Sequence, residues 1–281
     1  MAVYSVDSDA VLSATTAVRG TMERVQGDTH AMLAQLTPLQ SSWTGTAAAS
    51  FHGVIEQWRG VQQQVEESLG AIGGALAVAG LLTALPRARE LVKTLYLLPA
   101  VISTVAIAFL FVRIYSLEPV GLLNQLLAWV GLDGLQTAWL SNVQTVLAAV
   151  SVPEGWRFTG LYMLIIYAAL IAVPKELEEA ARLDGASWWQ TFWRIRFPYI
   201  RPVWITTTVM ATTFALRGFD IPYLLTNGGP GQASELLTTY MYKTAFVHTD
   251  YGYASAISVF IVVECLVAVG LIFLLLRRKD A

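Results

Sequence analysis

Charged side chains and cysteine are scarce in this chain of 281 residues. Only 14% of the residues are charged and 55% are hydrophobic, a more apolar balance than in an average soluble domain, which indicates lipid as the solvent. The single cysteine, Cys265, excludes an intramolecular disulfide and a cysteine-based metal site. The histidines His30, His52 and His248 lack acidic or sulfur ligands at suitable spacing. We therefore expect no metal site, no other cofactor and no catalytic residue.

A strong net charge is also absent. The net charge of −2 favours neither nucleic acid nor an acidic substrate as a partner. The N-terminal sequence MAVYSVDSDA has neither the basic flank nor the apolar core of a signal peptide. Internal segments are therefore expected to direct insertion into a membrane.

Two amphipathic patterns precede the most apolar part of the chain. Apolar side chains recur at heptad spacing between residues 11 and 39, and every three or four residues between residues 51 and 69. The short stretch 40–45 separates them, which predicts an antiparallel helical hairpin. Because so small a hairpin buries little apolar surface, we expect residues 1–72 to form a homodimer or heterodimer.

The turn of this hairpin carries Trp43 and Gly45 in a W-x-G pattern, and residues 5–72 resemble the WXG100 (ESAT-6-like) family. The resemblance implies a partner-binding module with these two residues at the partner-binding turn. An ordinary turn is the alternative, with the glycine supplying unusual backbone angles and the tryptophan capping the hairpin. The family's export signal requires a tyrosine after the second helix, but none occurs between Tyr4 and Tyr96.

The chain becomes strongly apolar after residue 69. Five nearly uncharged stretches follow: Leu69–Leu85, Leu95–Val112, Phe158–Val173, Val203–Leu216 and Ala254–Leu276. A membrane span needs about 20 apolar residues, so these stretches predict four clear spans and a shorter first remnant. The third stretch can be lengthened by residues 143–152, with an interruption expected at Pro153-Glu154-Gly155.

Basic residues predict which loops face the cytoplasm. They gather in three segments: Arg87, Arg89 and Lys93; Lys175, Arg182, Arg194, Arg196 and Arg201; and Arg277, Arg278 and Lys279. The segments 113–142 and 217–253 hold at most two basic residues each. By the positive-inside rule, the loop at 174–202 and the C-terminus are expected in the cytoplasm of a multi-pass protein of the bacterial cell membrane.

The loop at 174–202 has clear helix signals. Pro174 suits a first helical position, and the helix is expected to run to about Asp184. Gly185 permits a left-handed stop. Ser187 and Gln190 then form a capping-box pattern that begins a second helix.

The second helix of this loop is rich in aromatic residues, and we expect Pro198 and Pro202 to close it. The aromatic residues are Trp188, Trp189, Phe192 and Trp193. Aromatic and basic residues beside a bilayer are also typical of an amphipathic segment that lies on lipid.

The spacing of Glu179-Ala180-Ala181, Gly185 and Ile195-x-Phe197-Pro198 resembles the EAA loop of ABC importer permeases. The resemblance covers about residues 73–281 and includes several flanking motifs. These are Leu95-Tyr-Leu-Leu-Pro99, Trp156-Arg157, Pro174-Lys-Glu-Leu177, Asp184-Gly-Ala-Ser187, Phe219-Asp220, Gly228-Gly-Pro-Gly231 and Tyr251-Gly-Tyr-Ala-Ser255. Together they look like carbohydrate-type permeases, similar to the maltose and glycerol-3-phosphate importers.

The resemblance implies an all-α fold in which a helical hairpin (1–72) precedes a type I importer-like transmembrane bundle (73–281) of four to five spans. It also implies cytoplasmic ATPase subunits, a second permease subunit and an extracytoplasmic solute-binding protein as partners, in a membrane of lipid. The subunit itself would hydrolyse nothing. The residues expected to couple it to the ATPase are Glu179, Ala180, Ala181, Asp184, Gly185, Ile195 and Pro198. For Asp184, a purely local role at the helix end is an equal alternative.

An ionisable residue inside a predicted span is a candidate for the transport path, and Glu264 is the one in the last span. It can equally sit neutral or pair with a neighbouring helix. The family's first span is missing, and the side on which the hairpin lies depends on whether 69–85 crosses the membrane. The rival hypotheses are a membrane-tethered WXG100 protein and a non-functional hybrid.

Overall fold

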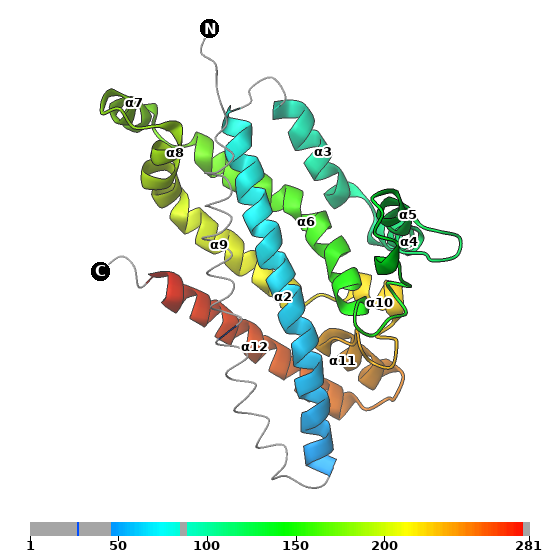
Figure 1. The fold of residues 1–281 in the computed structure, drawn as a ribbon. Helices are drawn as coiled ribbons and strands as arrows, with labels where there is room; N and C mark the ends of the chain where they lie inside the picture. Colours follow the sequence, from blue (N-terminus) through cyan, green and yellow to red (C-terminus); the bar gives the residue numbers. More distant parts are fainter. Residues whose placement is uncertain (1–26, 28–45, 85–88, 278–281) are drawn as a thin grey trace.

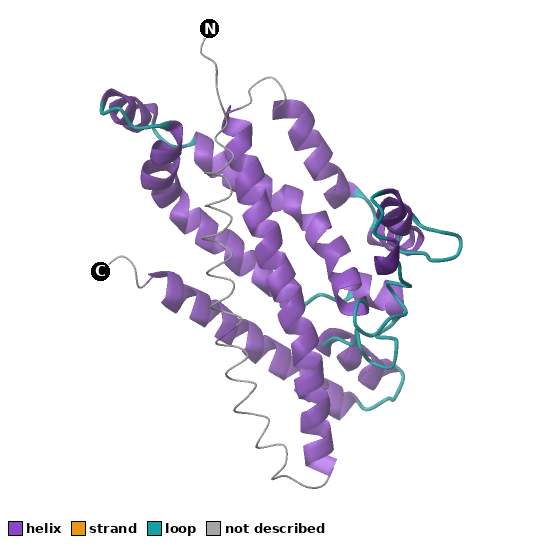
Figure 2. Ribbon diagram, viewed as in Figure 1, coloured by secondary structure: helices purple, strands orange, loops and turns teal. Residues whose placement is uncertain are grey.

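The computed structural model describes residues 27, 46–84 and 89–277. These residues are helical or form connections between helices, without a strand among them (Figure 2). This agrees with the predicted all-α class. Apart from Gly27, the first predicted hairpin helix and the turn with Trp43 and Gly45 lie outside the described residues, so the hairpin and its dimer remain predictions.

One long helix, α2 (Thr46–Ala84), crosses the front of the molecule in Figure 1. It joins the predicted second hairpin helix to the first apolar stretch without a break at residue 72. The helix contains several glycines, each of which costs up to about 1 kcal/mol in a helix interior. Packing offsets this, since α2 lies against α6 and α9, and five apolar side chains are buried in the part of α2 whose side chains the structure describes. These are Ile72, Ala75, Leu76, Ala79 and Leu82. The division into 1–72 and 73–281 therefore remains a prediction, with its boundary inside a helix.

The stretch Leu95–Val112 does not form one straight helix. It is divided between α3 (Arg89–Val101) and α4 (Thr104–Ile114), which meet at an angle of 100°. The backbone at Ser103 is extended (φ −56°, ψ 136°), and its carbonyl accepts the N–H of Ile107 at 3.0 Å to begin α4. The span predicted here is thus broken at residues 102–103, and the two helices together count as one candidate crossing.

Helix α6 (Val146–Ile171) runs through the expected interruption at Pro153-Glu154-Gly155. A proline removes one helical hydrogen bond and strains the preceding turn. Here Pro153 is buried within α6, and the helix packs along α2. The predicted break is wrong because tertiary packing holds the helix together across the proline.

The predicted end of the aromatic helix at Pro198 and Pro202 is also wrong. Helix α8 (Trp188–Thr191) continues through a π-helical turn, η2 (Phe192–Arg196), into α9 (Phe197–Leu216), which contains both prolines. In η2 the N–H of Phe197 binds the carbonyl of Phe192, five residues back. This wider turn ends beside Pro198, so the position with the missing N–H follows a turn that is already displaced from α-helical pairing.

The remaining described elements are α5 (Leu122–Trp129), the short 3-10 helix η1 (Asp133–Leu135), α7 (Lys175–Leu183), α10 (Asp220–Thr226), α11 (Leu237–Phe246) and α12 (Tyr251–Arg277). Figure 1 places α7 and α8 at the upper left and α10 and α11 at the lower right, with α2, α6 and α9 running between the two ends. The two ends of the molecule are thus joined by helices that pack on one another.

Two helices in the described part of the chain, α2 and α12, are long and apolar enough to cross a membrane, over Gln62–Leu82 and Tyr251–Leu274. The bent pairs α3–α4 and α6–α7 raise the number of candidate crossings to four. The predicted span at Val203–Leu216 is not among them, although it lies in α9. The threonines of α9 lower its mean hydropathy.

Candidate functional site

The site predicted at 174–202 begins with α7, whose charges suit its direction. The helix starts after Pro174, carries Glu176 and Glu178 in its first turn, and has Arg182 in its last turn. Acidic side chains near the N-terminus and a basic side chain near the C-terminus stabilise a helix through its dipole. The predicted first helix of the loop is therefore confirmed.

The turn after α7 has the backbone that the sequence predicts. Gly185 lies in the left-handed region at φ +77°. The N–H groups of Gly185 and Ala186 donate to the carbonyls of Arg182 and Ala181 at 3.1 and 2.9 Å, the pattern of a Schellman motif. This pattern satisfies the carbonyls at the end of the helix and turns the chain sharply.

The second helix of the loop begins with the predicted capping box. The N–H of Ser187 donates to Gln190 Oε1 at 2.9 Å, and the N–H of Gln190 donates to Ser187 Oγ at 3.3 Å. Two N–H groups at the start of α8 are thereby satisfied by local side chains. Together, α7, the turn and α8 form a compact helix-turn-helix.

An ion pair that the sequence analysis missed ties α7 to the helix beyond the turn. Arg196 Nε and Nη2 donate to Glu178 Oε1 and Oε2 at 2.7 and 2.6 Å. The two side chains are only 12% and 16% exposed. Eighteen positions separate the partners, so no helix periodicity could have revealed the pair.

The predicted coupling residues do not share one environment. Four of them are exposed at or near the tip of the loop: Glu179, Ala180, Asp184 and Gly185. Pro198 is also exposed, Ile195 is half-buried, and Ala181 is buried. Leu183, which the sequence analysis did not single out, has the largest exposed fraction of the large apolar side chains in the loop, at 88%. The sequence signal that could have identified Leu183 is its place as an apolar residue at the end of a helix rich in charged residues.

Comparison with known proteins decides the family. The family described as "Binding-protein-dependent transport system inner membrane component" matches residues 71–280, about three quarters of the chain. The chain belongs to this family. The part of this transport component that matches the family contains α7, η2, α9 and α12 in full.

Relatives and solved structures are similar to this transport component over much of its length. A probable ABC transporter permease protein, YurN of Bacillus subtilis, is 43% identical over 61% of this chain and 58% of its own. The trehalose/maltose transport system permease protein MalF of Thermococcus litoralis is 35% identical over 69% of this chain and 64% of its own. A crystal structure of a bacterial ABC transporter that imports the acidic polysaccharide alginate superposes with a TM-score of 0.72 and 25% identity, over 89% of this chain and 90% of that chain.

The chain spans about three fifths of the length of these two relatives. A second family, "Proteins of 100 residues with WXG", matches residues 3–81. This match overlaps the transport family at 71–81, inside α2.

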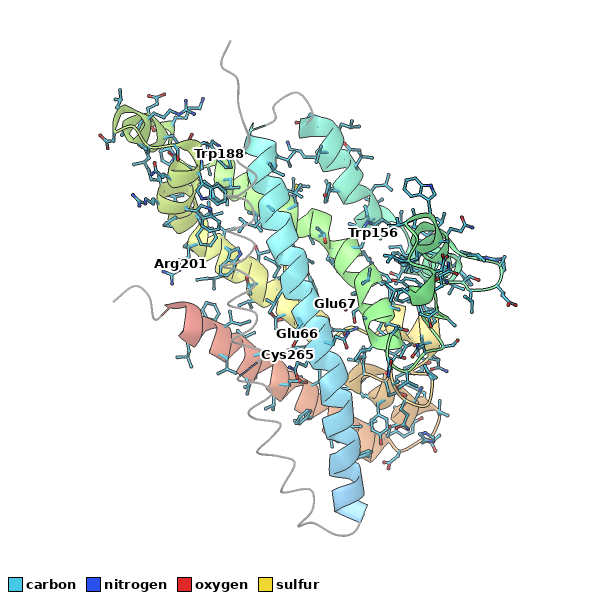
Figure 3. All side chains as sticks on the ribbon, viewed as in Figure 1. Glu66, Glu67, Trp156, Trp188, Arg201 and Cys265 are labelled. Carbon is cyan, nitrogen blue, oxygen red and sulfur yellow. The ribbon has the colours of Figure 1, made fainter. Side chains whose placement is uncertain are left out.

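Aromatic rings hold the loop of this transport component against its bundle. The rings of Trp189, Phe192, Trp193 and Phe197 form a continuous series of contacts with centroid separations of 4.9–6.1 Å. Figure 3 shows Trp188 on α8 at the same end of the molecule. Some of the aromatic residues predicted in the second loop helix therefore pack on the bundle. Phe192 is buried in the main apolar core, and Trp193 packs against that core.

Glu264, predicted in the transport path, is half-buried on α12. A cavity of about 330 Å³ lies where α9, α11 and α12 meet, lined by Arg217, Phe219, Thr238, Met241, Ser258 and Ile261. Glu264 does not line it. Its role in transport remains a prediction.

A second, open groove of about 570 Å³ lies between α2 and α6. It is lined by Glu66, Glu67, Gly70, Ala71, Val152, Gly155, Trp156 and Thr159. Figure 3 shows the two glutamates on α2 and Trp156 on the neighbouring part of α6. The described residues contain no cluster of three or more side chains that could hold a metal ion.

Proposed function

We propose that this chain is the membrane-spanning permease subunit of an ABC importer for a sugar or a related polyol. The family match over 71–280 supports the transport role. The names of relatives that transport trehalose and maltose, and the structural likeness to an alginate importer, support a carbohydrate substrate. The substrate would pass through the bundle, while ATP hydrolysis would occur on separate ATPase subunits.

The tip of the loop at 174–202 is the observation that carries this proposal. Glu179, Ala180 and Leu183 are exposed on α7, and Gly185 turns the chain away immediately after the helix. A small side chain beside an exposed apolar one permits close contact with a cleft, and a carboxylate can accept hydrogen bonds from its wall. In this proposal α7 enters a cleft on the ATPase, and Asp184, Ala181, Ile195 and Pro198 shape the loop around it.

We further propose that the loop and the C-terminus face the cytoplasm. The concentration of basic residues in these two segments supports this orientation. In Figure 1, α7 and the end of α12 both lie on the left, while α10 and α11 lie on the right. A solute-binding protein would meet the α10–α11 end, and a second permease subunit would pack beside the bundle within the lipid.

Capture of the cognate ATPase subunit by the purified chain tests the proposal. Gly185→Trp is expected to abolish capture, since the residue has φ +77° and leads directly from the docking helix. Gly134→Trp is the matched control, because no neighbouring atom lies within 4 Å of a Cβ there and its φ is not strained. Equal recovery of ATPase by the wild type and Gly185→Trp would reject the proposal.

A second proposed function is a partner-binding module at residues 1–72, favoured by the WXG100 match over 3–81. Trp43 and Gly45 would then lie at the partner-binding turn. Recovery of a WXG100-type partner that depends on Trp43, without any recovery of ATPase, would favour a membrane-tethered binding protein. Cysteine accessibility from Ala71 to Thr83 would show on which side of the membrane this module lies.

A further inference from the structure

Helix α7 has little packing of its own. Among its side chains only that of Ala181 is buried, and its link to α8 is the four-residue turn at 184–187. A glycine in the middle of this turn gives the backbone a ready hinge. Packing and backbone alone would therefore transmit little force from α7 to the bundle.

The Glu178–Arg196 pair supplies a second connection with a defined direction. Two parallel hydrogen bonds of 2.7 and 2.6 Å join a planar guanidinium to a planar carboxylate. Such a bidentate pair restricts rotation as well as separation. Because both side chains are largely shielded from water, with 12% and 16% exposed, the pair is screened less than a surface ion pair.

Arg196 belongs to the continuous helical segment of α8, η2 and α9, which packs into the transmembrane bundle. Arg196 is the last residue of η2, and α9 begins at the next residue. Ile200, Ala211 and Ala215 of α9 are buried, and α9 packs against α2, α6 and α12. A displacement of Arg196 therefore acts on a helix with contacts along the whole bundle.

We propose that the Glu178–Arg196 pair is the joint that makes α7 and α9 move as one body. This proposal rests on the proposed function, in which the ATPase applies force to α7. Glu178 and Arg196 are positioning residues, since their side chains are turned toward each other and shielded, whereas the neighbouring Glu179 and Leu183 are exposed for docking. Loss of the pair should leave docking intact and reduce the transport obtained from each ATP.

The transport test uses the complete importer in proteoliposomes. Arg196→Lys keeps the charge but loses the planar fork, and Glu178→Gln loses the charge. Both are expected to retain ATPase capture and to lower sugar uptake per ATP hydrolysed about fivefold, an effect in the usual range for coupled residues. Glu176→Gln is the matched control, because that glutamate lies in the same turn of α7 and is exposed.

A charge exchange tests whether the pair itself matters. Glu178→Arg and Arg196→Glu should each reduce uptake per ATP, and the two together should restore most of it. Unchanged uptake per ATP in the single variants overturns the proposal, as does an exchange that restores nothing. Loss of ATPase capture in Arg196→Lys and Glu178→Gln also overturns it, because the pair would then serve docking.

A distance measurement on the chain alone separates this proposal from the proposed function. Spin labels at the exposed positions Leu183 and Thr206, in a Cys265→Ala background, report the distance between α7 and α9. The distribution should be narrow in the wild type, broad in Arg196→Lys, and narrow again in the exchanged pair. Identical distributions overturn the joint. Failure of the unlabelled wild type to capture ATPase, alongside the expected distributions in the labelled chains, defeats only the transport function.

Discussion

The ring of Phe192 lies on Gly80, so the π-turn and α2 meet where α2 has no side chain. A Cβ added at Gly80 would lie 3.3 Å from Phe192 Cε2 and 3.5 Å from Cζ. Phe192 is 4% exposed and belongs to the main core, together with Ala79 and Leu82 of α2. The glycine therefore sets how closely the loop and the bundle approach.

Gly80→Val is expected to destabilise the protein by about 1–3 kcal/mol, because the added methyl groups must displace a buried ring. The measurement is the thermal unfolding of the purified protein in detergent. Gly74→Val is the matched control, since it lies in the same helix with no neighbouring atom within 4 Å of the new Cβ. Equal unfolding temperatures for the two variants would contradict the role of the contact.

Gly160 of α6 faces the backbone of α3. A Cβ there would overlap the carbonyl of Tyr96, so Gly160→Ala should separate α3 from α6. Glycine to alanine in a helix interior ordinarily stabilises by about 1 kcal/mol. We expect the opposite sign at Gly160 and the ordinary sign at Gly270 of α12, where nothing lies within 4 Å. Thermal unfolding of both variants checks this, and a stabilised Gly160→Ala would show that α3 and α6 do not make this contact.

Glu235 and Lys243 form a shielded pair between the α10–α11 connection and α11. Lys243 Nζ donates to Glu235 Oε2 at 2.6 Å and to the carbonyl of Asn227 at 2.7 Å, and the glutamate side chain is 4% exposed. Removing one partner leaves a buried charge, so Lys243→Met should destabilise by about 3–5 kcal/mol. The added change Glu235→Gln should recover part of this loss.

Unfolding of these two variants in detergent measures the effect, with the exposed Lys175→Met as control. A Lys243→Met protein as stable as that control would show that the pair contributes nothing to the connection.

The effect of substitutions at Gly185 on ATPase capture should follow how readily each residue type adopts a left-handed backbone. The φ of +77° at Gly185 favours glycine, is tolerated by asparagine and strains alanine by about 1–2 kcal/mol. We therefore expect ATPase capture to fall in the order wild type, Gly185→Asn, Gly185→Ala. Affinity measured by titration of the ATPase subunit checks the order. A variant series that follows side-chain volume instead would indicate a steric requirement at the turn.

Leu183→Asp should weaken ATPase capture and leave the stability of the permease unchanged. The side chain is 88% exposed at the end of α7, so it contributes little to the folded chain and is available for contact. Leu135→Asp, in the distant η1 segment and 58% exposed, is the control. Equal capture by both variants would place the docking contact elsewhere.

Helix start and stop signals were sufficient to predict much of the structure of the loop at 174–202. Proline before α7, a left-handed glycine after it, and the Ser187–Gln190 box each depend on residues within about one turn, so the sequence alone could reveal them. The long apolar run of α12, in which Glu264 is the one charged residue before Arg277, was equally readable, because its apolar length suffices for a span. The spacing around Glu179-Ala180-Ala181 also indicated the family.

Tertiary structure decided what depends on distant partners. Pro153 stays inside α6 because α2 packs along that helix. Pro198 stays inside the continuous helical segment from α8 to α9 because a π-helical turn precedes it. Glu178 and Arg196 meet only because the turn at Gly185 folds one helix back toward the next. Sequence patterns state which conformations a segment prefers, while packing and long-range pairing determine which interruptions are overridden and which charges come together.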